Sequence, residues 1–192
     1  MEPEMSKFTI HTKETAPAEA LPALEKAEKK FGRIPNLIGG LSEAPVAAEA
    51  YLTLSELVSR SSFTPAERHV VWFTVNSYHD CRYCMAAHTA IAKMESVDDA
   101  VIDAARNVES YDDPRLESLR QFTLSIVEKR GWVNDEETES FLAAGFTRQQ
   151  ILEIVTIIAQ KVMSNYTNHL IETPVDDAFA KFAWEKPESV SA

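Results

Sequence analysis

The chain has 192 residues, of which 45% are hydrophobic, and this length and composition predict one globular domain with a substantial core. Its net charge of −11 and the lack of a basic patch argue against nucleic-acid binding, because phosphate recognition needs clustered Lys and Arg. No apolar run approaches the ~20 residues of a membrane-spanning helix, and the N-terminus lacks the basic and apolar regions of a signal peptide. We therefore expect a cytoplasmic protein that contacts no membrane.

Helices are predicted along most of the chain. Only five glycines occur, Ala, Glu, Leu and Lys recur, and no alternating segments joined by Asn-Gly or Asp-Gly turns are present, so the fold class is all-α. The polar start predicts an N-terminal arm at residues 1–15, followed by a single all-α domain at 16–192. The expected helices cover residues 17–30, 44–59, 64 to just before 80, 81–95, 97–106, 114–130, 135–143, 149–171 and 175–182.

Two helix starts carry the same signal. Thr64-Pro65-Ala66-Glu67 combines a capping box with an early proline, so the following run Val70–Val75 is predicted as a buried helix although its propensity also suits a strand. Asp80 is placed to cap the next helix, beginning at Cys81. The capping pattern recurs at Thr147-x-x-Gln150, and the two copies lead to His88 and His169. This echo predicts a pseudo-repeated helical hairpin, with chance similarity of amphipathic helices as the alternative.

The only two cysteines, Cys81 and Cys84, precede His88 with C-x-x-C-x-x-x-H spacing. On a helix these offsets fall at about 0°, 300° and 340°, so the three side chains share one face. Two sulfurs one turn apart can close a disulfide, and a histidine one turn further can manage the proton. In a reducing cytosol such a pair is expected to be catalytic or metal-binding. The pattern therefore predicts thiol redox chemistry.

Which sulfur attacks is left open by the sequence. The helix N-terminus favours a thiolate at Cys81, whereas the nearby His88 favours Cys84. Two other interpretations are a zinc site with His69 or His79 as fourth ligand, and two inert core cysteines. Structural zinc pairs usually lie on a knuckle and not along one helix, which disfavours zinc.

Several segments resemble AhpD-like alkylhydroperoxidases of the carboxymuconolactone decarboxylase superfamily. They are Thr64-Pro65-Ala66-Glu67-Arg68, the stretch from Cys81 to Ala92, and Asn165-Tyr166-Thr167-Asn168-His169-Leu170 with Thr173-Pro174, the last resembling one subgroup. The resemblance covers about residues 15–185. It implies an all-α fold assembled as a homodimer, trimer or hexamer.

The resemblance also implies a peroxidase cycle. Cys84 would be peroxidatic and Cys81 resolving, so that the Cys84 sulfenic acid formed by peroxide becomes a Cys81–Cys84 disulfide. His88 would join a proton relay. A dithiol reductant, a lipoyl or thioredoxin-like protein, would reopen the disulfide. The cycle needs no cofactor and no metal ion.

One position departs from the family pattern. The family relay uses a Glu twelve residues before the first cysteine, where this chain has His69. His69 could carry the proton instead, or be an ordinary partly buried histidine. Glu67 is sufficiently explained by its capping box. Tyr83 stands at a position where the resemblance implies a second relay histidine, and it is favoured as a packing aromatic. His79 is expected in a loop, and His169 in the core or at an interface.

Three functions follow in order of preference. The first is a thiol peroxidase acting on hydrogen peroxide or alkyl hydroperoxides. The second is a thiol–disulfide oxidoreductase or redox sensor without peroxide turnover. The third is a decarboxylase-like protein or oligomeric scaffold, disfavoured because lactone decarboxylation needs no vicinal dithiol. A homo-oligomer is expected, because the apolar faces of residues 70–75 and 151–163 are too extensive for one small domain to cover.

Overall fold

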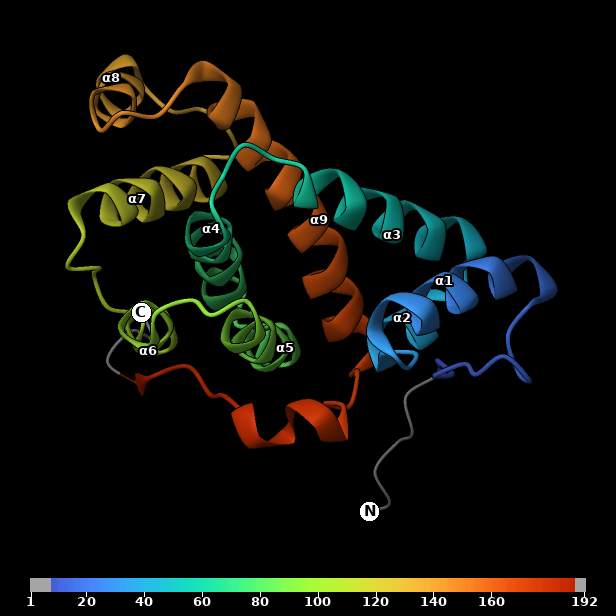
Figure 1. Cartoon of the computed structure of the whole chain (residues 1–192). Coiled ribbons are helices and arrows are strands. Elements are labelled where there is room, and N and C mark those ends of the chain that lie inside the picture. Colours follow the sequence, from blue (N-terminus) through green and yellow to red (C-terminus); the bar gives the residue numbers. More distant parts are fainter. Residues whose placement is uncertain (1–7, 189–192) are drawn as a thin grey trace.

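The computed structural model describes residues 8–188, and within this range the chain is helical with no strand (Figure 1). The all-α prediction is confirmed. Residues 1–7 of the expected N-terminal arm and residues 189–192 lie outside the described residues. The α-helices are α1 Leu21–Phe31, α2 Asn36–Leu41, α3 Pro45–Ser59, α4 Pro65–Tyr78, α5 Arg82–Met94, α6 Asp99–Asn107, α7 Pro114–Glu128, α8 Asp135–Ala143 and α9 Arg148–Ile171, and two 3₁₀-helices are η1 Ala18–Ala20 and η2 Asp177–Phe182.

Helices α4, α5 and α9 lie at the centre of the molecule, with α1–α3 on one side and α6–α8 on the other (Figure 1). Helices α4 and α9 each begin with the predicted capping box. Thr64 Oγ1 accepts from Glu67 N at 3.2 Å, and Thr147 Oγ1 accepts from Gln150 N at 3.2 Å. The sequence Val70–Val75 is a fully buried part of α4, as the capping signal indicated.

The turn between α4 and α5 corrects one prediction. Asp80, expected to cap α5, instead has a left-handed φ of 53°, and Cys81 occupies the N-cap position. The chain must reverse within a few residues here, and Asp is among the residue types that tolerate this conformation. The N–H group of Cys81 donates to the Asn76 carbonyl at 2.9 Å, which closes the turn. The first cysteine is therefore fixed to the end of α4.

Buried apolar side chains form two clusters. The larger one is built from α4, α6, α7, α8 and the first half of α9, with Phe141 stacked between Phe122 and Phe146. The smaller one joins α1, α2 and α3 to the start of α5, and it includes Cys81, Tyr83 and Cys84. The cysteines therefore lie where the N-terminal helices pack on the central helices.

The apolar run 70–75 was also predicted to help self-association, and this is wrong. Its side chains are at most 8% exposed within one chain, because α4 is surrounded by α5, α6, α7 and α9. The other predicted segment, 151–163 on α9, does keep apolar side chains at the surface, among them Leu152 and Val155.

Within residues 8–188 no single helix is both long and apolar enough to cross a membrane; α8 and α9 meet the two conditions only when they are taken together, as a pair bent by 109°.

Candidate active site

The C-x-x-C-x-x-x-H motif lies on α5, which runs antiparallel to both α4 and α9. Cys81 is the N-cap residue, Cys84 lies in the first turn, and His88 follows one turn later. Along α9, Asn168 contacts the cysteines and Lys161, two turns earlier, contacts His88. The predicted cluster of Cys81, Cys84 and His88 is thus assembled on one side of α5, against a polar face of α9.

Both cysteines are reduced and buried, with exposed fractions of 0% for Cys81 and 2% for Cys84. The Asn168 amide lies 3.2 Å from Cys84 Sγ and 3.8 Å from Cys81 Sγ, so it points its Nδ2 donor toward both sulfurs. Ser164 Oγ lies 3.8 Å from Cys84 Sγ. The stronger set of polar contacts therefore converges on Cys84.

The thiols of Cys81 and Cys84 differ in acidity because their polar contacts differ. Burial by itself raises the pKa of Cys84, but the hydrogen bond from Cys81, the charge of Lys161 and contacts with Ser164 and Asn165 outweigh it and lower that pKa. Cys81 donates the shared hydrogen bond, and this together with burial raises its pKa. Of the two sulfurs that the sequence left open, the geometry favours Cys84 as the thiolate.

His88 contacts a residue that the sequence analysis did not single out. Its Nε2 lies 2.9 Å from Lys161 Nζ, and Lys161 is only 1% exposed. No carboxylate within residues 8–188 forms an ion pair with Lys161. Burial, the charge of Lys161 and the neighbouring His69 hold the pKa of His88 well below its ordinary value. His88 is therefore a neutral imidazole bound to a buried amine.

His69 is fully buried next to this pair. Its ring centroid lies 5.9 Å from that of His88, and its Nε2 lies 3.3 Å from Glu95 Oε2, without hydrogen-bond geometry. Burial, followed by the charges of Arg68 and Lys161, lowers the pKa of His69 to about 3. A titration of His69 near the ordinary value of ~6.5 is therefore not expected.

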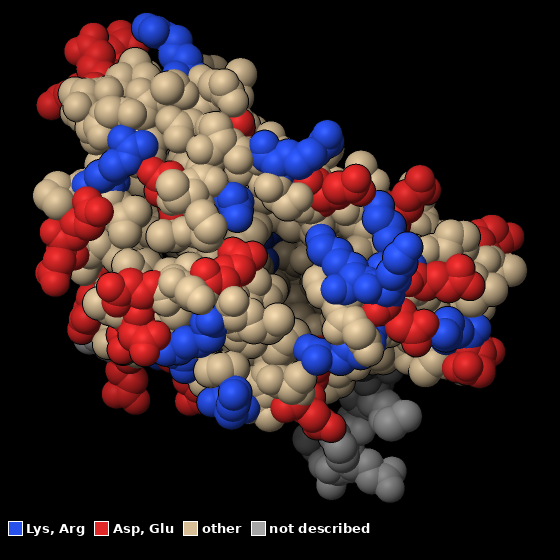
Figure 2. All heavy atoms as spheres, in the orientation of Figure 1, with Lys and Arg blue, Asp and Glu red and all other residues tan. Residues whose placement is uncertain are grey.

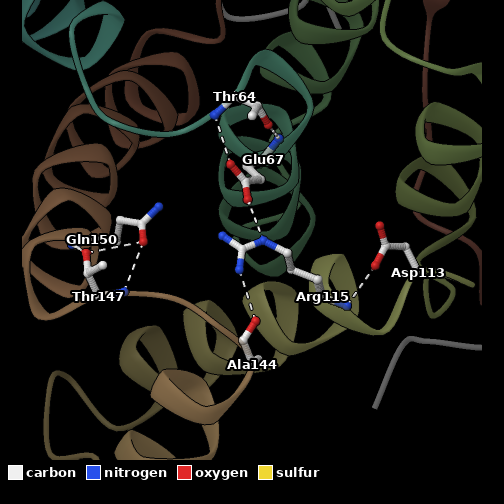
Figure 3. Close-up of polar contacts among 7 residues, drawn as sticks. All are labelled: Thr64, Glu67, Asp113, Arg115, Ala144, Thr147 and Gln150. Carbon is white, nitrogen blue, oxygen red and sulfur yellow. Dashed lines mark hydrogen bonds and ion pairs between the residues drawn. The ribbon is translucent and has the colours of Figure 1, made fainter.

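Glu67 makes its polar contacts at the start of α4, with Thr64 and Arg115 (Figure 3). Its carboxylate accepts from Thr64 N at 2.9 Å and from Arg115 Nε at 2.9 Å, and Arg115 also donates to the Ala144 carbonyl at 3.0 Å. The guanidinium of Arg115 lies 3.8 Å from the Phe146 ring centroid. At about 1.5 Å per residue, α4 separates Glu67 from the end that carries the cysteines by roughly 16 Å. Glu67 thus ties α4 to α7 and to the loop after α8.

Tyr83 packs toward the other side of α5. Its hydroxyl donates to Asp176 Oδ2 at 2.6 Å and accepts from Leu37 N at 3.3 Å. Asp176 also accepts from Asn36 N at 3.2 Å, and the Tyr83 ring meets Phe179 edge to face. Tyr83 therefore joins α5 to α2 and to the segment before η2, which gives a structural reason for the aromatic between the cysteines.

His79 lies in the turn after α4, as expected for a loop residue, and His169 does not lie in the core of the single chain. His79 caps the end of α4, and its Nδ1 lies 3.0 Å from Asn165 Oδ1, whose amide also donates to Asn76 Oδ1 at 3.0 Å. His79 therefore connects this turn to the polar face of α9. His169, expected in the core or at an interface, is exposed in the single chain. Within residues 8–188 no group of three or more His, Cys, Asp and Glu is arranged to hold a metal ion, so neither His69 nor His79 completes a zinc site with the cysteines there.

Several polar residues of α9 line the site, although the sequence analysis did not propose them as site residues. They recur at spacings of three and four along α9, which is otherwise rich in apolar residues, and this spacing puts them on one helix face. This stripe of polar residues on one face of an apolar helix was the sequence signal that could have identified them as site residues. Its buried members are Gln160, Lys161, Ser164, Asn165 and Asn168.

Comparisons with known proteins agree with this architecture. Residues 45–123 match the carboxymuconolactone decarboxylase family. An uncharacterized peroxidase-related protein with an AhpD core from Ralstonia eutropha JMP134 shares the fold with a TM-score of 0.80 at 22% identity, covering 91% of this chain and 94% of that chain. Another peroxidase-related protein, from Silicibacter sp. TM1040, gives 0.76 at 19% identity, covering 93% and 95%.

The debrominase Bmp8 has the same fold. A cysteine-to-alanine variant of it, in complex with 2,3,4-tribromopyrrole, gives a TM-score of 0.75 at 18% identity and covers 93% of this chain and 96% of that chain. A search of curated sequences found no significant match. Residues 45–123 thus resemble the carboxymuconolactone decarboxylase family, and the chain as a whole has the fold of the AhpD-like proteins.

Proposed function

We propose that the protein is a thiol peroxidase in which Cys84 attacks the peroxide and Cys81 resolves the product. The observation that carries this proposal is the asymmetry of the buried pair. Polar contacts from Asn168 and Ser164 and the charge of Lys161 act on Cys84, while the Cys81 thiol serves as a donor to it. A thiolate is the attacking species in this chemistry, so the more acidic thiol is assigned the first step.

The cycle has three steps. The Cys84 thiolate attacks the O–O bond, forms the sulfenic acid and expels hydroxide or alkoxide, which takes a proton. Cys81 then attacks the Cys84 sulfur, forming the disulfide and releasing water. An external dithiol, from a lipoyl or thioredoxin-like protein, exchanges with the disulfide and restores both thiols. A cytoplasmic location suits this cycle, because dithiol reductants keep thiols reduced there.

The buried imidazoles of His88 and His69 lie close to the cysteines and suit the proton transfer of this cycle. His88 lies one turn from Cys84, and His69 adjoins it, where relatives use a carboxylate. Since both imidazoles are neutral, each can accept a proton at one nitrogen and release one at the other. Figure 2 shows a hollow near the middle of one face, between α4–α5 and α9, from which a small peroxide would approach.

The direct test is peroxide consumption with dithiothreitol or dihydrolipoamide as donor. Turnover by the unmodified chain that is lost in Cys84→Ser supports the proposal, and mass spectrometry after mild peroxide should show the loss of two hydrogens as the disulfide forms. Disulfide exchange with a peptide, without peroxide turnover, selects the thiol–disulfide oxidoreductase instead. A metal adduct that protects the thiols from alkylation until a chelator is added contradicts both.

Reductive dehalogenation is a second candidate, favoured by the shared fold with the debrominase Bmp8 over 93% of this chain. A vicinal dithiol can supply the two electrons. A carbon–bromine bond becomes a carbon–hydrogen bond, bromide and a proton leave, and the two thiols become a disulfide. Bromide release from a brominated pyrrole, with no peroxide consumption under the same conditions, selects this activity.

A further inference from the structure

We propose that Lys161 is the counter-charge of the Cys84 thiolate and the donor of the proton that the leaving hydroxide takes, so that the oxidation state of the cysteine pair sets the charge of this buried lysine. The thiolate half of the proposal is independent of the substrate. The proton-donor half rests on the proposed peroxidase function.

This inference rests on the row of polar contacts between α5 and α9. Asn168 meets Cys84 at 3.2 Å and Lys161 meets His88 at 2.9 Å, with Ser164 lying between them on α9. Ser164, one turn from Lys161 on α9, contacts Cys84, and His88, one turn from Cys84 on α5, contacts Lys161. Lys161 and Cys84 therefore lie within one turn of each other across the interface between the two helices. His88 also holds Lys161 in place, because its Nε2 accepts the hydrogen bond of Lys161 Nζ.

The charge balance points to the same pairing. A buried ammonium without an anion is strongly destabilising, because desolvation is not offset by an opposite charge. Within residues 8–188 Lys161 has no carboxylate partner. The titratable groups near it on the packed helices are Tyr51 from α3, His69 and His79 from α4, and Cys81, Cys84 and His88 from α5.

Only one member of this set suits the role of anion. The histidines are neutral or positive, and burial raises the pKa of Tyr51. Cys81 donates its hydrogen bond to Cys84, and that donor role raises the pKa of Cys81. The Cys84 thiolate is therefore the negative charge that this buried site can offer to Lys161.

Oxidation removes that charge. One thiolate, one thiol, one ammonium and one hydrogen peroxide give the disulfide, a neutral amine and two waters, which balances atoms and charge. The sulfurs lose two electrons, the O–O bond gains them, and the two waters take their added protons from the Cys81 thiol and from Lys161. Reduction by an external dithiol returns the proton to Lys161.

The test uses the purified full chain with Cys81→Ser, in which the ultraviolet absorbance of the thiolate and the alkylation rate report the pKa of Cys84. Adding Lys161→Met should raise that pKa by about 1 to 3. At mildly acidic pH the alkylation rate should then fall roughly tenfold or more. Adding Lys161→Arg, which keeps the charge but does not release a proton, should preserve the low pKa. Lys29→Met, at an exposed position on α1, is the matched control and should change nothing.

Two further readouts use both native cysteines. In the Lys161→Met variant the equilibrium with glutathione should shift toward the disulfide by roughly tenfold, about 30 mV, because the stabilised thiolate is lost. Should the variants fail to fold, NMR of isotope-labelled lysine in the unmodified chain decides. The expected result is a protonated Lys161 Nζ in the reduced protein and a neutral one in the oxidised protein.

Two results overturn the inference: an unchanged Cys84 pKa in Lys161→Met, or the same protonation state of Lys161 in both redox forms. Neither depends on peroxide turnover, so they are separate from failure of the proposed function. If Lys161→Arg keeps full peroxidase turnover, Lys161 is not the proton donor. Loss of turnover in Lys161→Arg with a preserved thiolate supports the donor role.

Discussion

At the residue scale, His69 is the position where this chain departs from the pattern of the AhpD-like proteins that its sequence resembles. The structure buries it completely, places its ring 5.9 Å from that of His88 and puts the alternative residue, Glu67, at the far end of α4. We therefore expect His69→Ala to slow peroxide turnover by roughly 10²-fold, the usual effect of a lost acid–base group. His69→Glu should recover activity, because it recreates the family's carboxylate. Steady-state kinetics with a fixed dithiol donor measures both.

Glu67 provides the matched control. Glu67→Ala removes a capping partner and leaves Arg115 without its ion pair, so it should cost about 1 to 2 kcal/mol of unfolding free energy with little change in rate. Loss of turnover in the Glu67 variant together with full turnover in His69→Ala would mean that the relay runs through Glu67.

At the element scale, the hydroxyl of Tyr83 connects three segments: α5, α2 and the chain before η2. In Tyr83→Phe the buried Asp176 loses its closest donor, so we expect a loss of about 1 to 3 kcal/mol in unfolding free energy. If the side chain acts only in packing, thiolate reactivity at Cys84 should stay within about twofold of the unmodified chain. Urea unfolding and alkylation kinetics test the two statements, and a large loss of reactivity with unchanged stability would show that Tyr83 belongs to the relay.

Most helices were predictable from the sequence because their signals are local. The capping boxes at Thr64 and Thr147 mark the two central helices, and both are present. Helix α2 was missed since it contains Gly39 and Gly40, which disfavour helices in isolation. Tertiary contacts explain it: a side chain at Gly39 would meet the His11 carbonyl oxygen at 2.8 Å, and one at Gly40 would collide with Ile171.

The candidate site was predictable on α5 but not on α9. The spacing of Cys81, Cys84 and His88 is visible in the sequence. Lys161, Ser164 and Asn168 contact these residues only because α9 packs antiparallel to α5. A lysine on a helix is normally a solvated residue, and its burial follows from a long-range contact that no local pattern encodes.

At the scale of the whole molecule, two buried histidines make stability depend on pH. In the unfolded chain a histidine binds a proton below ~6.5, while the pKa of folded His69 is lowered to about 3 and that of His88 also lies well below the ordinary value. Between the lowered pKa values of the folded histidines and the ordinary value of ~6.5, the unfolded state therefore binds more protons than the folded state. Folding stability should fall as the pH is lowered from ~6.5, by up to about 1.4 kcal/mol per pH unit for each histidine.

Urea unfolding of His69→Leu over this pH range tests the prediction. The variant should show a shallower loss of stability on acidification than the unmodified chain, while the exposed His169→Leu should not differ from it. An equal slope in all three proteins would contradict the assignment of His69 as a neutral buried group.

The surface of α9 opposite the site suits self-association, and we propose a homo-oligomer built on it. Exposed apolar residues there fall within an arc of about 60°, the spacing of a helix–helix seam. They are Leu152, Val155, Ala159, Tyr166 and Leu170. Light scattering should give a mass well above the 21.5 kDa of one chain, and Leu152→Glu with Leu170→Glu should reduce it to that value. Met94→Glu, also exposed but outside the seam, is the control. A single-chain mass at micromolar concentrations before any substitution would refute the oligomer.

The central claim is that Cys84, and not Cys81, carries the first oxidation. It is tested most directly by treating Cys81→Ser and Cys84→Ser with one equivalent of hydrogen peroxide in the presence of a sulfenic-acid probe, and locating the adduct by mass spectrometry. Since polar contacts lower the pKa of Cys84 and raise that of Cys81, the adduct should form on Cys84 in the Cys81→Ser protein and be absent from the Cys84→Ser protein. An adduct on Cys81 in the Cys84→Ser protein, with none on Cys84 in the other, would reverse the assignment.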